Sequence, residues 1–247
     1  MISIVICSIT PAKFNRVTQM YRRLLAGTEF EIIGIHDAKG MAEGYNRGLA
    51  QSRGDLIVFS HDDVEFLAPE FAPRLLGHLG HCDVLGIAGT TRLGDARWVN
   101  AGMPYVYGQV AAPNPNGTYQ VCIWSAAQRR IDGIRAMDGV FLCARRPVVE
   151  SLRFDEQAYK DFHLYDIDFT FRAHLAGHRL SVANDLYLVH QSTGSGSRTW
   201  PQDAAHFQAK FRTALSPPTG RMSQFTLVTA PTAADVVEVM TPPHWGM

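Results

Sequence analysis

The segment Leu56-Ile57-Val58-Phe59-Ser60-His61-Asp62-Asp63 is the most informative part of this sequence. Its apolar run predicts a buried strand. A strand that ends in acidic residues at an open sheet edge delivers them to the crevice where α/β proteins bind ligands. Because residues two apart in a strand share a face, His61 and Asp63 are expected to point one way and Asp62 the other. Carboxylate oxygens suit a hard divalent cation on a ligand's phosphates, although the triplet taken alone is more simply a polar turn.

The segments around this strand alternate between strand and helix patterns. Strands are expected at 2–8, 31–35, 56–60 and 84–88, and helices at 14–25, at 41–52 and after Pro69. Phe14, Val17 and Tyr21, for example, recur at helical spacing. Strands that alternate with helices of this length predict an α/β fold with one Rossmann-like, mostly parallel central sheet and helices on both faces.

The second half of the chain changes character. A small antiparallel hairpin is expected from 98–110 and 119–125, around the turn Pro113-Asn114-Pro115-Asn116-Gly117. The Ser- and Gly-rich stretch 191–198 is expected to be mobile. Further strands are expected at 140–144, 180–183 and 186–189, and further helices at 166–176 and 201–215.

Length and composition limit what the chain can be. Its 247 residues fit one large domain or two small ones. One domain is expected at 1–215, followed by a tail, 216–247, of unassigned role. Lys plus Arg and Asp plus Glu each number 23, and no basic stripe indicates nucleic acid. No apolar run approaches the ~20 residues of a membrane span, and the N-terminus reads as a strand rather than a signal peptide. Four cysteines without CxxC spacing fit a reducing compartment, so a cytoplasmic protein is expected.

The stretch 43–64 resembles family-2 glycosyltransferases of the GT-A fold. It contains Asn46-Arg47-Gly48 in a helix, the turn Gly54-Asp55, the apolar strand and then His61-Asp62-Asp63-Val64. Members of that family place an acidic metal-binding motif after the strand. The His-x-Asp-Val version resembles a bacterial subgroup in which His replaces the first acidic residue.

A second block of motifs strengthens the resemblance. The segments that recur in the same order in the subgroup are Phe154-Asp155-Glu156, His163-Leu164-Tyr165-Asp166-Ile167-Asp168, Gly177 and His190-Gln191-Ser192. Together the two blocks cover most of residues 1–195.

The resemblance implies a reaction. A nucleotide-sugar donor, expected to be UDP-linked, would bind at the ends of the parallel strands, and the hydroxyl of a glycan, lipid-linked or protein acceptor would attack its anomeric carbon. The displacement is direct and inverts the anomeric configuration. Residues 1–95 would then form the nucleotide-binding half, and residues 96–215 the acceptor-binding and catalytic half.

The resemblance also implies a divalent cation, with Asp63 as its main ligand. His190 ends a later strand, where related GT-A enzymes place a His on the metal, and ligation is favoured over the alternative of a satisfied surface histidine. His61 is a poor Mg²⁺ ligand that can ligate Mn²⁺ or orient a water molecule. An Asp and His pair favours Mn²⁺ over Mg²⁺. The cation would neutralise the departing diphosphate.

Asp166 and Asp168 cannot point at one target, because they lie ~160–200° apart around a helix. Asp168 falls near the apolar stripe of Leu164, Ile167, Phe171 and Leu175, and Asp166 falls opposite. The family's base matches Asp166, so Asp166 is expected to be the general base and Asp168 a helix cap or the partner of Arg172. An acidic residue at a helix N-terminus otherwise simply caps it.

Several other residues are expected to contact the donor. Asp37 would recognise the nucleotide base, Asp62 the ribose or a metal-bound water, and Arg198, on a lid at 195–200, a phosphate. Aromatic residues of the hairpin could stack on a sugar or simply pack: Trp98, Tyr105, Tyr107 and Trp124. The remaining candidates for this pocket are Thr10, Pro11, Asn46 and Asp138.

Two other functions fit parts of the pattern. A sugar nucleotidyltransferase shares the nucleotide-binding sheet and the metal, but the segment 9–13 is not the Gly-rich, basic loop that such enzymes usually need. A non-catalytic nucleotide- or carbohydrate-binding relative is favoured only by His61 in place of the acid. The groups His78/His81/Cys82 and His174/His178 have too few ligands for a closed zinc site.

Overall fold

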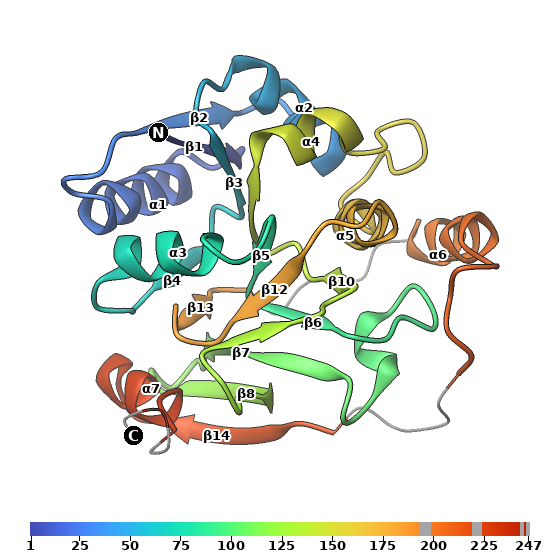
Figure 1. Ribbon diagram of the computed structural model, residues 1–247. Helices are drawn as coiled ribbons and strands as arrows, with labels where there is room; N and C mark the ends of the chain where they lie inside the picture. Colours follow the sequence, from blue (N-terminus) through green and yellow to red (C-terminus); the bar gives the residue numbers. More distant parts are fainter. Residues whose placement is uncertain (193–198, 219–223, 243–244, 246–247) are drawn as a thin grey trace.

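The computed structural model describes residues 1–192, 199–218, 224–242 and 245. Two seven-stranded sheets share one molecule, and helices pack on both faces of the first sheet. In Figure 1 the second sheet, with β7, β8 and β14, lies below the first sheet, and α6 stands at the right edge. This arrangement confirms the α/β class that the sequence predicts.

The first sheet contains the strand of the acidic triplet at an inner position. Its order is β2 (Phe30–Ile35), β1 (Ile2–Cys7), β3 (Leu56–Ser60), β11 (Phe141–Arg145), β5 (Val84–Gly86), β12 (Leu180–Ala183) and β9 (Arg130–Asp132). The pairs β1/β2, β1/β3 and β5/β12 are parallel, whereas β3/β11, β5/β11 and β9/β12 are antiparallel. Five of the seven strands therefore run in the same direction, and β11 and β9 run against them, so the sheet is mostly parallel, as expected, with two antiparallel strands. β11 inserts antiparallel between β3 and β5, and β9 pairs antiparallel with β12 at the edge of the sheet.

Alternation along β1 and β3 explains why both faces are covered. Ile4, Ile6 and Val58 point into one apolar cluster, and Val5 and Phe59 point into another. The first cluster lies under α1 (Pro11–Leu24) and α3 (Phe71–Leu79). The second lies under α2 (Met41–Gln51), α4 (Arg146–Leu152) and α5 (Tyr165–Leu175).

The second sheet is larger than the hairpin expected from the sequence. Its order is β10 (Ala136–Met137), β6 (Ala88–Thr90), β7 (Val106–Pro113), β13 (Leu188–His190) and β4 (Val64–Phe66), and β7 also pairs β8 (Tyr119–Ser125), which pairs β14 (Thr226–Ala230). The hairpin β7/β8 forms around the expected turn, but Trp98–Ala101 is a 3₁₀-helix, η1, instead of strand. The expected strand 84–88 ends at Gly86, and Ala88 already belongs to the second sheet.

The remaining elements are α6 (Trp200–Lys210) and α7 (Ala233–Val239). Thr232 and Asp235 form a capping box at the start of α7. Residues of the proline-containing tail thus form β14, which joins the second sheet, and α7, which packs against β8 and β14. Among the described residues, no helix is both long and apolar enough to cross a bilayer.

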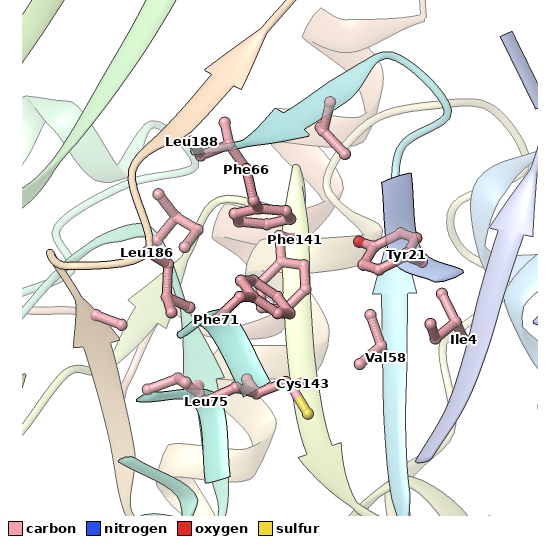
Figure 2. Packing of buried hydrophobic residues seen from close by; sticks show 14 of the residues in the cluster. Ile4, Tyr21, Val58, Phe66, Phe71, Leu75, Phe141, Cys143, Leu186 and Leu188 are labelled. Carbon is pink, nitrogen blue, oxygen red and sulfur yellow. The ribbon is translucent and has the colours of Figure 1, made fainter. Parts of the chain in front are cut away.

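A buried aromatic group joins the two sheets beside the acidic triplet. The ring of Phe66 on β4 lies 4.8 Å from that of Phe71 and 4.9 Å from that of Phe141 on β11. Figure 2 shows these three rings grouped together, with Tyr21 facing β3. The Tyr21 hydroxyl donates to Oγ of Ser60 at 2.8 Å, immediately before His61. Burial of this kind fixes the turn that carries the triplet.

Candidate active site

Residues 61–63 form the turn between β3 and β4, and β13 runs beside that turn. His190 pairs with Val64 in the ladder, and the backbone N–H of Gln191 donates to the carbonyl of Asp63 at 2.8 Å. This pairing places Nε2 of His190 3.2 Å from Oδ1 of Asp63. The side chain of Asp63 is only 9% exposed, so the contact lies in a largely dry setting.

His61 completes a group of three potential metal ligands. Its ring centroid lies 5.4 Å from that of His190. One ligand atom each from His61, Asp63 and His190 lie within 4.8 Å of one another, and the part of the chain that the structure describes holds no second group of this kind. Asp63 and His190, which the resemblance places on one cation, thus lie together, and His61, whose ligation the sequence leaves open, lies beside them.

The charges of this group suit a divalent cation. Burial acts to raise the pKa of Asp63, but hydrogen bonding and charge from His190 outweigh it and hold that pKa well below its usual range. Burial, with the nearby His190, lowers the pKa of His61, which favours the neutral imidazole that can donate a lone pair. One carboxylate and two imidazole nitrogens form a donor set that fits a transition metal such as Mn²⁺ better than Mg²⁺.

Tyr165 supports the group from α5, although the sequence motif that contains it assigns it no role. Its hydroxyl lies 3.1 Å from Nε2 of His61 and also approaches the carbonyl of Gly139. Tyr165 is buried, so this contact fixes the orientation of the imidazole. Partners of this kind orient metal-binding histidines. The only available signal was its place directly before Asp166.

Asp166 opens onto a hollow that His61 and His190 also line. This α5 hollow, defined by the residues around Asp138, Asp166, Phe162, Trp98 and Trp200, has a volume of about 540 Å³. Oδ2 of Asp166 accepts a hydrogen bond from the backbone N–H of Gly139 at 2.7 Å. Burial, and then the neighbouring Asp138, raise the pKa of Asp166 to about 7. A carboxyl group with such a pKa can exchange a proton near neutral pH.

The backbone of Gly139 approaches α5 closely. A Cβ atom at this position would lie 2.5 Å from the hydroxyl oxygen of Tyr165 and 2.6 Å from Cβ of Asp166. Asp138 occupies the preceding turn, where its Oδ1 accepts from the N–H of Val140 at 3.0 Å. The segment 138–140 thus presents Asp138 and the Gly139 N–H to Asp166.

Asp168 points away from this hollow into the protein. It is fully buried and forms ion pairs of 2.6 Å with both Arg172 and Lys210. The expected separation of Asp166 and Asp168 around the helix is observed, and Asp168 pairs with Arg172 as expected. Leu175, expected on the buried stripe, is 50% exposed, because the apolar surface of α5 shifts toward Phe169 and Ala173.

A second hollow lies at the carboxyl end of β1. This β1 hollow, about 330 Å³, is lined by Ser8, Thr10, Ala38, Asp62 and Asp63, and by seven further residues: Cys7, Ile9, Lys13, Ile35, Met41, His61 and Phe162. The Ser8 hydroxyl donates to Oδ2 of Asp62 at 2.6 Å, which points Asp62 toward β1 and away from His190. Phe162 and His61 line both hollows, so the two spaces meet at these side chains.

Two expected contact residues, Asp37 and Pro11, do not line the β1 hollow. Asp37 is 77% exposed and pairs with Arg47 at 2.7 Å, and its neighbour Ala38 lines the β1 hollow instead. Pro11, the first residue of α1, is exposed beside Thr10. Arg198 and most of the expected lid lie outside the described residues.

Asn46 has a structural task in this molecule. Its Nδ2 donates to the carbonyl of Phe154 at 2.9 Å and to Glu156 at 2.8 Å, and its Oδ1 accepts from the N–H of Phe154 at 3.0 Å. These bonds tie α2 to the segment that leads into α5. Asn46, from the first block of sequence motifs, is therefore hydrogen-bonded to Phe154 and Glu156 of the second block.

Aromatic residues of the second half border the α5 hollow. Trp98 packs against Trp124 with centroids 5.1 Å apart, and the Arg97 guanidinium lies 4.1 Å from the Trp200 ring centroid. Trp98 is 8% exposed, so it serves mainly as packing, whereas Phe162 is 56% exposed at the mouth shared by both hollows. An exposed phenylalanine at such a place offers a surface for a ring-shaped ligand.

Comparison with known proteins agrees with this geometry. Residues 3–210 match the model of a family described as "Glycosyltransferase like family". The chain belongs to this family. Its fold is that of the GT-A enzymes. No curated protein matches the sequence.

Solved structures share the fold at low sequence identity. One is the mannosyltransferase PcManGT from Pyrobaculum calidifontis in complex with GDP-Man and Mn²⁺, with a TM-score of 0.52, 12% identity and coverage of 88% of this chain and 66% of that chain. Another is GalNAc-T7 with UDP, GalNAc and Mn²⁺, with a TM-score of 0.50, 11% identity and coverage of 85% and 47%. The chain thus spans only part of the length of these structures.

Proposed function

We propose that this protein is a glycosyltransferase that transfers a sugar from a UDP-linked donor to an acceptor hydroxyl, with inversion at the anomeric carbon and with the help of a divalent cation. The observation that carries the proposal is that His61 and His190 of the three-ligand group line the same hollow as Asp166. Both similar structures described above contain Mn²⁺ together with a nucleotide or nucleotide sugar, which supports the same class of ligand.

Asp63, His190 and His61 would hold the cation, with Tyr165 orienting His61. When bound, a divalent cation supplies Lewis-acid stabilisation of the departing diphosphate. We prefer Mn²⁺ to Mg²⁺ because two of the three ligands are imidazoles. The His-x-Asp-Val motif is consistent with the bacterial subgroup that the sequence resembles.

Asp166 would act as the general base. Its carboxylate takes the proton of the acceptor hydroxyl while that oxygen forms the new bond to the anomeric carbon and the bond to the diphosphate breaks. A base works best when its pKa lies near the working pH, and burial beside Asp138 provides that condition. The N–H of Gly139 holds Asp166 in place. Attack from the α5 hollow on a donor whose diphosphate lies at the cation gives inversion.

The β1 hollow would receive the nucleotide, with Thr10 and Asp62 on its wall. Asp37 and Pro11 would contact the nucleotide from outside this wall. Arg198, expected to contact a phosphate, lies outside the described residues. Residues 1–95 then serve mainly the donor, and residues 96–215 serve the acceptor and the base. A glycan, a lipid-linked saccharide or a protein hydroxyl could enter the α5 hollow beside Asp138. The four unpaired cysteines support a cytoplasmic location.

A donor screen tests this proposal. UDP-sugars and GDP-sugars are incubated with the protein and Mn²⁺, with and without chelator, and release of nucleoside diphosphate is measured. We expect release from a UDP-sugar only when the metal is present, and its loss in Asp166→Asn but not in the surface variant Glu150→Gln. No release from any nucleotide sugar, or equal release in chelator, would count against the proposal.

A further inference from the structure

Among the described residues, Lys13 is the one lysine or arginine that forms an ion pair with Asp63, and the family resemblance assigns it no role. It lies in the first turn of α1, and its Nζ is 3.4 Å from Oδ2 of Asp63 and 3.9 Å from Oδ1 of Asp62. Both distances are longer than the 2.6 Å of the ion pair between Asp168 and Arg172. The Lys13 side chain is 45% exposed, so its ammonium is held loosely and can move.

Lys13 stands at the wall between two hollows. It lines the β1 hollow, and it also lines a third space, the α1 hollow of about 360 Å³, beside Arg16, Arg23 and Glu65. Within the described lining of the β1 hollow, Lys13 is the one Lys or Arg, while Asp62 and Asp63 are the acids. A ligand with several negative charges in that hollow would therefore find one basic side chain.

The position of Lys13 conflicts with a cation on Asp63. An ammonium 3.4 Å from the same carboxylate would repel a divalent ion placed there. Lysine has a flexible four-carbon stem, which allows it to change partners at little cost. A diphosphate beside the cation would offer the ammonium a new partner within the same hollow.

We propose that Lys13 exchanges partners during donor binding. Without a metal ion it neutralises Asp63 and competes with the cation, and when the cation and a nucleoside diphosphate bind, it turns to the diphosphate and stabilises it as the leaving group. This inference rests on the proposed function, because it assumes a diphosphate in the β1 hollow. It adds a second positive group to the one that the metal supplies.

The exchange predicts two effects of opposite sign from one substitution. Lys13→Met keeps the apolar stem and removes the charge. Without nucleotide, it should bind Mn²⁺ about 3–10-fold more tightly, since a competing charge is gone. With saturating Mn²⁺, it should bind UDP about 10–100-fold more weakly, the usual effect of losing a hydrogen bond between charged groups. A purely structural ion pair would not strengthen metal binding.

The experiment is a pair of titrations on the full chain. Mn²⁺ binding is followed by calorimetry without nucleotide, and UDP and uridine binding by calorimetry in saturating Mn²⁺. Lys13→Arg should retain UDP affinity, and Arg16→Met, which removes a neighbouring charge of the α1 hollow, is the matched control and should change UDP affinity less than twofold. Uridine, which lacks phosphate, should bind wild type and Lys13→Met equally.

The outcomes separate the two proposals. If the wild type binds UDP with Mn²⁺ but Lys13→Met binds it equally well, the partner exchange is wrong and the proposed function stands. If Lys13→Met binds Mn²⁺ more weakly than wild type, Lys13 does not compete with the cation for Asp63, and that part of the proposal is wrong. If the wild type binds Mn²⁺ but no nucleotide, the proposed function and this inference both fail.

Discussion

Nε2 of His190 lies 3.2 Å from Oδ1 of Asp63, although the two residues come from opposite halves of the chain. The contact exists because β13 and β4 pair in the second sheet, with His190 opposite Val64. The metal group therefore depends on both sheets: Asp63 follows a strand of the first sheet, and His190 ends a strand of the second. Disturbing either sheet near this point should disturb cation binding.

The first prediction concerns Asp63. Asp63→Ala removes the one carboxylate of the three-ligand group and should weaken Mn²⁺ binding by more than the ~10–100-fold that loss of an outer partner costs. UDP binding should weaken only when metal is present. Calorimetry with UDP in Mn²⁺ and in chelator measures this, and equal loss under both conditions would argue against ligation.

The second prediction concerns Tyr165. Tyr165→Phe removes the hydroxyl that lies 3.1 Å from Nε2 of His61 and leaves the buried ring in place. We expect Mn²⁺ affinity to fall about 10–100-fold with little change in folding. Tyr119→Phe, in β8, is the control and should leave Mn²⁺ affinity unchanged. Unaltered metal binding in Tyr165→Phe would show that the hydroxyl does not position the imidazole.

The third prediction is the pH dependence of transfer. The pKa of Asp166 is raised to about 7, so its carboxyl is mostly protonated below that pH and cannot accept a proton. The rate should therefore fall about tenfold per pH unit below 7 and level off above it. Initial rates between pH 5 and 9 at saturating donor and metal measure the profile. A rate independent of pH across this range would exclude Asp166 as the base.

The fourth prediction is the matching effect on stability. An unfolded Asp has a pKa of about 3.9, so between that value and about 7 the folded protein binds more protons than the unfolded chain. The contribution of Asp166 to stability is thus most favourable at low pH and is lost as pH rises through about 7. Asp166→Asn removes the buried charge and should raise Tm at pH 8, by about 2–4 °C for each kcal/mol gained in the free energy of unfolding. At pH 4 it should have little effect. A Tm that falls at pH 8 would contradict this sign.

The fifth prediction concerns the ion pairs behind the base. Asp168 is fully buried between Arg172 and Lys210, so Asp168→Ala leaves two cations without their carboxylate. We expect the free energy of unfolding to drop by about 3–5 kcal/mol in urea titrations. Asp155→Asn, which removes the more exposed partner of Lys210, should cost about 0–1 kcal/mol. If both variants lose a similar amount of unfolding free energy, the buried ion pairs of Asp168 stabilise the fold no more than the more exposed pair of Asp155.

Local patterns predict the elements of the first half well. The apolar run before His61 and the helical spacing from Val17 to Tyr21 depend on neighbouring residues alone, and the structure follows both. The opposite faces of Asp166 and Asp168 also follow from helix geometry alone. Patterns of this kind predict which side a residue faces.

Pairing between distant segments could not be predicted in the same way. The antiparallel insertion of β11 and the addition of β14 to β8 depend on contacts across the chain, and neither leaves a periodic signal. The sequence assigns no role to Lys13 or Tyr165 for the same reason, because the importance of each comes from a partner brought close by folding. Asn46 belongs to a motif visible in the sequence, yet its bonds to Phe154 and Glu156 show a task that the motif alone does not define.

The most direct measurement is a calorimetric titration of the wild-type protein with UDP, in Mn²⁺ and again in chelator. If a cation held by Asp63, His190 and His61 anchors the donor's diphosphate, UDP should bind in Mn²⁺ and lose most of its affinity in chelator. UDP that binds equally well without any metal, or that does not bind at all, would contradict the account.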